Sequence, residues 1–151
     1  LRNTVALLAP QLRDKVTVRT LLQDIPNVQC FPGKVNQVFM NVITNAIQAT
    51  TARTDGAAPE VNISSCVDAD HVVITIADNG IGMSAEVKAR MFDPFFTTKP
   101  VGEGTGLGLA IVYGIVQDHH GRITVDSAVG LGTTIRIHLP VRYQRNQQQR
   151  A

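Results

Sequence analysis

The sequence has few aromatic side chains and no long apolar run. It contains no Trp, two Tyr and five Phe among 151 residues, so a core has to be mainly aliphatic. Hydrophobic residues make up 44% of the chain, which suits one globular domain of this length. Polar residues interrupt every apolar run well before the roughly 18 residues of a membrane span, and no signal-peptide pattern opens the chain. We expect a soluble piece, with any membrane anchor elsewhere in a longer parent protein.

Cysteines and clustered basic residues are also scarce. Cys30 and Cys66 match no metal-ligand spacing and are too few for a disulfide framework, which favours a reducing, cytoplasmic location. The formal net charge is only +2, and the basic residues are scattered except near the C-terminus. No electrostatic surface for nucleic acid stands out, so we expect no nucleic-acid partner.

Hydrophobic periodicity predicts an α+β domain. Apolar residues recur at helical spacing over 34–48 and 107–119, and a short helix is predicted over 85–90. Alternating and β-branched runs predict strands over 15–22, 60–66, 71–77, 122–126 and 133–139. This order is neither strictly β-α-β nor all-β, so we predict a two-layer α/β sandwich with helices on one face of a mixed sheet. The domain is expected to span residues 1–141, and the polar segment 142–151 to be a tail or linker.

The helix predicted over 34–48 carries an unusual polar face. Gln37, Asn41, Asn45 and Gln48 lie together opposite the apolar stripe. A solvated surface is the commoner explanation of such a face. However, Asn is a poor helix former, and an amide oxygen is a hard, neutral ligand that suits Mg²⁺.

A carboxylate and two glycines follow the strand predicted over 71–77. Asp78, Gly80 and Gly82 belong to the run D-N-G-I-G-M at 78–83. One interpretation is an Asn-Gly hairpin turn. The other is a base-binding site, in which the carboxylate accepts the exocyclic amine of adenine and disfavours guanine, which would present another acceptor. Both interpretations remain open from this run alone.

A second glycine cluster lies at 102–108, directly before the helix predicted over 107–119. Backbone amides at a helix N-terminus form an anion site, and a glycine-rich loop can close over phosphates. A flexible linker is the alternative, and no G-K-[ST] of a Walker-type loop follows. Three Phe in the run 92–96 are expected to anchor the base of this loop to the core, and Lys99 either reaches a phosphate or is solvated.

Five motifs in order resemble the catalytic ATP-binding domain of sensor histidine kinases, in the superfamily that also contains gyrase, chaperone and mismatch-repair ATPases. They are N-V-I-T-N-A at 41–46, D-N-G-I-G-M at 78–83, F-D-P-F-F-T-T-K-P at 92–100, G-T-G-L-G-L-A-I-V at 104–112 and G-L-G-T-T-I-R-I-H-L-P at 130–140. The resemblance runs from about Leu12 to Pro140. It implies a mainly antiparallel sheet, a long ATP lid loop, and ATP and Mg²⁺ as ligands.

The resemblance also implies roles for individual residues. Asn45 would bind Mg²⁺, and Asn41, Asn45 and Lys99 would form the catalytic set. Asp78 would bind the adenine amine, supported by Thr133 or Thr134. The residues expected to contact the nucleotide are Asn41, Asn45, Asp78, Gly80, Gly82, Met83, Gly104, Thr105, Gly106, Leu107, Gly108, Thr133 and Thr134.

Asn41 bears on the reaction. Related ATPases of the gyrase and chaperone type carry a Glu there to activate water, whereas a carboxamide is no general base at neutral pH. Transfer of the γ-phosphate to a histidine on a separate dimerisation domain is therefore expected over hydrolysis. Two alternatives stay open: a stand-alone ATPase and a nucleotide-sensing module without chemistry.

The phosphoacceptor is expected outside this chain. None of the chain's four histidines stands in a helical H-E or H-D context ahead of the ATP-binding segment, and each is expected to have a structural or surface role: His71, His119, His120 and His138. The dimerisation and histidine-phosphotransfer domain would lie upstream of Leu1, and a response regulator receiver domain would be the next partner. The parent is expected to be a homodimer and the isolated domain a monomer.

Overall fold

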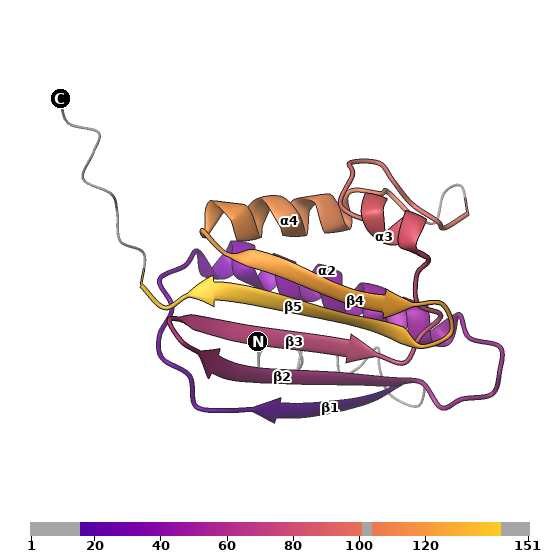
Figure 1. Ribbon diagram of the computed structural model, residues 1–151, viewed down its shortest axis with the longest axis horizontal. Helices are drawn as coiled ribbons and strands as arrows, with labels where there is room; N and C mark the ends of the chain where they lie inside the picture. The colour runs from indigo at the N-terminus through magenta and orange to yellow at the C-terminus, as the bar shows by residue number, and fades with distance from the viewer. Residues whose placement is uncertain (1–15, 101–103, 143–151) are drawn as a thin grey trace.

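A five-stranded mixed sheet carries the helices on one face in the computed structural model, which describes residues 16–100 and 104–142 (Figure 1). The strands are β1 (Thr17–Leu22), β2 (Glu60–Asp68), β3 (His71–Asp78), β4 (Arg122–Ala128) and β5 (Gly132–Pro140). Their order across the sheet is β1-β2-β3-β5-β4, with β1 parallel to β2 and every other pair antiparallel. The predicted α+β sandwich with a mixed, mainly antiparallel sheet is confirmed.

Three helices belong to the described ranges: α2 (Pro32–Thr51), α3 (Ala85–Arg90) and α4 (Gly108–Asp118). The bounds predicted for α3 are correct, but α2 is longer at both ends than predicted. Pro32 is tolerated in its first turn, where a backbone N–H has no intrahelical partner. At the other end, the Thr50 hydroxyl donates to the Ile47 carbonyl oxygen at 2.7 Å and stays inside the helix. No helix in these ranges is long and apolar enough to cross a membrane.

The strands also extend further than the sequence indicates. β2 continues to Asp68, so the turn into β3 is the pair Ala69–Asp70, where Ala69 adopts φ 50°. β4 continues to Ala128, and β5 already begins at Gly132, because the turn between the two strands is tight. Lys15, Gly102–Glu103 and residues 143–151 of the tail predicted over 142–151 lie outside the described residues.

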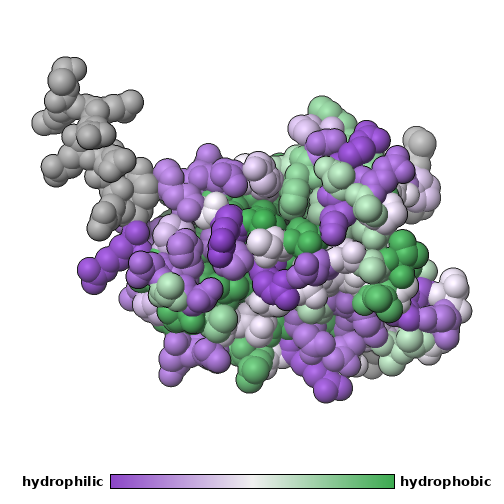
Figure 2. All heavy atoms as spheres, in the orientation of Figure 1, coloured by the Kyte–Doolittle hydropathy of each residue, from purple (hydrophilic) through white to green (hydrophobic). Residues whose placement is uncertain are grey.

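The core lies between the sheet and helices α2 and α4, and it is aliphatic. Phe39 is the only buried Phe or Tyr in the described ranges. The largest fully buried side chains of the described residues are Val38, Val42, Ile43, Val61, Ile63, Val72, Ile76, Val112, Val116 and Ile137. Apolar side chains are also exposed at the β4–β5 turn, at Val129 and Leu131. Figure 2 shows a green patch on the right of the molecule, the side on which this turn lies in Figure 1. The predicted aliphatic core is confirmed.

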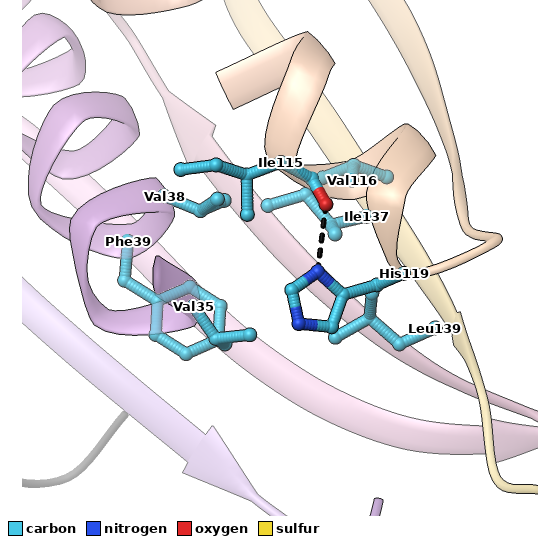
Figure 3. A pocket seen from close by; sticks show the side chains of 8 residues that line it. All are labelled: Val35, Val38, Phe39, Ile115, Val116, His119, Ile137 and Leu139. Carbon is cyan, nitrogen blue, oxygen red and sulfur yellow. Dashed lines mark hydrogen bonds between the residues drawn. The ribbon is translucent and has the colours of Figure 1, made fainter. Parts of the chain in front are cut away.

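His119 joins α4 to the start of α2 (Figure 3). Its Nε2 accepts the Phe31 backbone N–H at 3.0 Å, so the ring proton lies on Nδ1, which donates to the Ile115 carbonyl oxygen at 2.7 Å. The apolar side chains around the ring leave a pocket with no volume for water, about 0 Å³. This region is a packed helix–helix contact and not a ligand site, in agreement with the structural role predicted for His119.

The core assignment predicts the effect of truncating β5. Ile137→Ala removes a fully buried side chain, and the free energy of unfolding in urea is expected to fall by about 2–5 kcal/mol. Leu131→Ala is the matched control, because Leu131 is 80% exposed in the adjoining turn and its truncation is expected to change stability by less than about 0.5 kcal/mol. Equal losses in the two variants would contradict this assignment of the core.

Candidate functional site

A cleft of about 870 Å³ lies between α2, the ends of β3 and β5, and the glycine-rich segment before α4. Its size is in the range of small-molecule sites. The predicted site residues that line it are Asn41, Asn45, Asp78, Gly82, Met83, Lys99, Gly104, Thr105, Gly106, Gly108 and Thr133. Three predicted residues do not line it: Gly80, Leu107 and Thr134. The structure therefore brings the separate motifs to a single site.

The amide face of α2 forms one wall of the cleft. Asn41 and Asn45 are half-buried, whereas Gln37 is exposed and outside the cleft. Asn41 Nδ2 donates to the Gly108 carbonyl oxygen at 3.1 Å, so α2 is tied to the start of α4 and Asn41 Oδ1 remains available. A solvated surface does not explain the two Asn residues, because both line the cleft.

Lys99 lies over the same wall. Its Nζ is 3.5 Å from Asn45 Oδ1 and also donates to Gln48 Oε1. The ammonium therefore contacts the amide oxygens of α2, although the Lys99 side chain is exposed. Gln48 lines the cleft as well, although the sequence placed it only on the polar face of the helix.

Asp78 closes the opposite end of the cleft, at the C-terminal end of β3. Its Oδ1 accepts the Gly80 N–H at 2.8 Å. Burial raises the pKa of the Asp78 carboxyl above its usual value, and hydrogen bonds from the Gly80 and Thr133 backbone act in the opposite direction. A half-buried carboxylate with oxygen lone pairs towards the cleft is an acceptor for a ligand N–H.

The Asn-Gly pair after Asp78 is not a hairpin turn. β3 pairs with β2 and β5, and not with the next strand in the sequence. Asn79 Oδ1 accepts the Glu60 N–H at 2.9 Å, and Asn79 Nδ2 donates to the Ala58 carbonyl oxygen at 2.8 Å. Asn79 therefore fixes the end of β3 to the loop before β2. The interpretation of this run as a hairpin turn is wrong.

Gly80 shapes the cleft without lining it. A Cβ at this position would lie 2.6 Å from the Ala49 backbone carbon, and the neighbouring Ile81 N–H donates to the Ala49 carbonyl oxygen at 3.1 Å. Only a residue without a side chain allows this approach. The last turn of α2 is thereby held against the segment that follows Asp78.

The glycine-rich segment before α4, which is the predicted ATP lid, is held by backbone contacts at Gly106. This glycine adopts φ 64°, and a Cβ there would lie 2.4 Å from the Phe95 carbonyl carbon. The Phe95 N–H donates to the Gly106 carbonyl oxygen at 2.9 Å. Gly108 then begins α4, an eleven-residue helix whose N-terminus is at the cleft. Backbone N–H groups in this position favour an anion.

The predicted aromatic anchor is correct for Phe92 and wrong for Phe95. Phe92 packs against the core and lies 5.3 Å from the Tyr113 ring. Phe95 is 75% exposed with φ 66°, so its backbone and not its ring holds the lid. Phe96 is half-buried, with the Arg90 guanidinium 4.4 Å from its ring centre.

The structure separates the two threonines that the sequence left as alternatives. Thr133 is buried and lines the cleft, whereas Thr134 points to the other face of β5 because side chains alternate along a strand.

The site also involves Ser127, which sequence reasoning missed. Ser127 follows Ile123 and Val125 on the inward face of β4 and accepts the Met83 N–H at 2.9 Å. Its inward position in the alternating run was the available signal.

Burial of Asp78 predicts a stability change with a definite sign. Because the folded-state pKa is raised, ionisation of this group disfavours the folded state at neutral pH. Asp78→Asn is therefore expected to raise the urea midpoint of the ligand-free protein at pH 7. This gain is expected to shrink as the pH falls through the folded pKa and to vanish below the unfolded value near 4. A variant that is less stable at pH 7 would contradict the assignment.

Comparison with known proteins identifies the family. Residues 32–143 match the family described as histidine kinase-, DNA gyrase B-, and HSP90-like ATPase. Sporulation kinase E of Bacillus subtilis is 42% identical over 94% of this chain and 19% of its own length. Sensor histidine kinase ZraS of Escherichia coli is 38% identical over 83% of this chain and 25% of its own length. The chain thus spans a quarter or less of the length of these relatives.

Solved structures give the same result. The catalytic domain of histidine kinase ThkA is 28% identical with a TM-score of 0.79, and the match covers 93% of this chain and 89% of that domain. The mycobacterial sensor histidine kinase MprB is 26% identical with a TM-score of 0.78 and coverage of 95% and 93%. The resemblance inferred from the sequence motifs is confirmed. This chain belongs to the histidine kinase-, DNA gyrase B- and HSP90-like ATPase family, as an ATP-binding domain of the sensor histidine kinase type.

Proposed function

We propose that the cleft binds Mg-ATP and that the γ-phosphate is transferred to a histidine on a separate dimerisation domain of the parent protein. The carrying observation is the pair Asn41 and Asn45, which face the cleft beside the N-terminus of α4. Among the described residues that line the cleft, Asp78 is the only carboxylate, and it lies at the other end. With no carboxylate at the phosphate end among the residues that the structure describes, activation of water is disfavoured relative to positioning ATP for another nucleophile.

Asp78 would bind the base. Its carboxylate accepts hydrogen bonds only, which suits the exocyclic amine of adenine. A 6-oxo purine would place an acceptor against this acceptor and lose affinity. Met83 and Gly82 line the same end of the cleft and would pack against the base.

Asn45 fits a magnesium ion. Its Oδ1 already lies 3.5 Å from the Lys99 ammonium, so a cation is favoured at this oxygen. No group of three His, Cys, Asp or Glu that suits a metal occurs in the described ranges, and Mg²⁺ bound with ATP commonly takes one or two protein oxygens and completes its shell with phosphate and water. When bound, the ion would neutralise charge on the phosphates.

The remaining cleft residues would hold the phosphates. Amides at the start of α4 would bind phosphate oxygens, Asn41 would orient them beside Gly108, and Lys99 would add a point charge.

In the proposed transfer, the bond from the γ-phosphorus to the ADP oxygen breaks, and a bond from that phosphorus to an imidazole nitrogen of the acceptor forms. The four histidines of this chain do not line the cleft, so the acceptor would come from another domain. A response regulator receiver domain would then take the phosphoryl group.

Phosphotransfer provides the direct test. The chain is mixed with the histidine-bearing domain of its parent and labelled Mg-ATP, and acid-labile phosphohistidine is measured. Asn45→Ala is expected to lower the rate about a hundredfold through loss of the metal-binding oxygen. Gln37→Ala is the matched control, because Gln37 lies on the same helix but is exposed and outside the cleft.

Other results would favour the alternatives. Rapid ATP hydrolysis by the chain alone, abolished by Asn41→Ala, would indicate a stand-alone ATPase. Tight ATP binding without transfer to any partner domain would indicate a nucleotide sensor. The relatives favour the kinase, since each named above is a histidine kinase or a sporulation kinase.

The lid geometry predicts a separate effect on binding. Gly106→Ala places a methyl group against the Phe95 backbone at a positive φ, so ATP affinity measured by calorimetry is expected to fall about tenfold. Gly114→Ala is the control, since a Cβ there meets nothing within 4 Å in α4. It is expected to leave ATP affinity unchanged and to raise stability by about 0.5–1 kcal/mol. Equal ATP affinity in the two variants would contradict the assignment of Gly106 to the lid.

A further inference from the structure

We propose that Ser127 is a positioning residue that fixes the Thr133 hydroxyl as a hydrogen-bond acceptor at the base end of the cleft, and thereby selects a purine with an exocyclic amine over a 6-oxo purine. This inference rests on the proposed function, in which Asp78 and its surroundings bind the base. Ser127 does not line the cleft, so its effect has to pass through Thr133, which does.

The hydrogen bonds of Ser127 restrict where its hydroxyl proton can lie. Ser127 Oγ accepts the Met83 N–H at 2.9 Å and donates to the Gly132 carbonyl oxygen at 3.0 Å. It also lies 2.9 Å from Thr133 Oγ1. A serine hydroxyl has one proton, so all three contacts are hydrogen bonds at once only if this proton goes to the Gly132 carbonyl oxygen, which can only accept. The third contact is then a hydrogen bond only if Thr133 donates to Ser127.

This arrangement decides what Thr133 offers to a ligand. Its one hydroxyl proton points at Ser127, so only lone pairs remain for the cleft. Thr133 is 8% exposed and is the register partner of Asp78 across β3 and β5. Two acceptors, a carboxylate and an oriented hydroxyl, therefore lie side by side at this end of the cleft.

Two adjacent acceptors complement an amine, which carries two protons. A 6-oxo purine offers only lone pairs where adenine has its amine, so the hydrogen bonds of the amine to these acceptors are lost. Specificity is thus set by a hydroxyl that never touches the ligand.

The expected result is a change in base selectivity. The dissociation constants of ATP and of inosine triphosphate, its 6-oxo analogue, are measured by calorimetry. In Ser127→Ala the Thr133 proton is free to turn to the cleft, and the preference for ATP is expected to fall about three- to tenfold. Thr124→Ala, on the exposed face of the same strand, is the control and is expected to keep the preference.

A double-mutant cycle separates positioning from a general structural effect. In a Thr133→Val background, Ser127→Ala is expected to cause no further change in the ATP preference. Thr133→Ser, which keeps the hydroxyl, is expected to retain the preference of the unaltered chain, and this variant tests the idea even where Ser127→Ala folds poorly.

Three outcomes would overturn the proposal. They are an unchanged preference in folded Ser127→Ala, an equal drop with and without the Thr133 hydroxyl, and loss of the preference in Thr133→Ser. Failure of the proposed function gives a different result, since the unaltered chain would then bind ATP no more tightly than inosine triphosphate, or not at all, and this inference would fall with it.

Discussion

The last turn of α2 rests on the segment that follows β3, and the rest of the site depends on this contact. Ile81 donates to the Ala49 carbonyl oxygen at 3.1 Å, and Gly80 leaves no side chain to hold the two backbones apart. The amide face of the helix and the Asp78 carboxylate consequently line one cleft. The distance between the proposed phosphate and base ends is thus set by packed backbone, which is far stiffer than a pair of surface side chains.

The chemistry of the two ends differs because their environments differ. At the base end, Asp78 is half-buried. Its pKa is raised because the charged carboxylate loses part of its hydration there. At the other end, neutral amides and the start of α4 stand beside the more exposed Lys99. A buried acceptor suits a neutral amine, while partial positive charges near solvent suit phosphates. Loss of the Asp78 charge is therefore expected to raise the stability of the ligand-free protein and to weaken binding of the base.

Much of this arrangement could be predicted from the sequence, and the exceptions have physical reasons. Periodicity located the core helices, and the motifs located the cleft residues. Phe95 was expected to anchor the loop to the core, but its side chain is 75% exposed and its backbone adopts φ 66°. The Asn79–Gly80 pair resembled a hairpin because local turn propensity says nothing about which strand β3 will pair with.

The sequence by itself determined the family, the aliphatic core and the helix face with two Asn residues. It also determined that position 41 holds an amide and not a carboxylate. These properties depend on local periodicity and on the identity of single residues. Only the tertiary structure decided that Thr133 rather than Thr134 faces the cleft, and that Ser127 contacts both Thr133 and Met83. Strand register and hydroxyl orientation decide these contacts, and both are set by residues far apart in the chain once β3, β4 and β5 have come together.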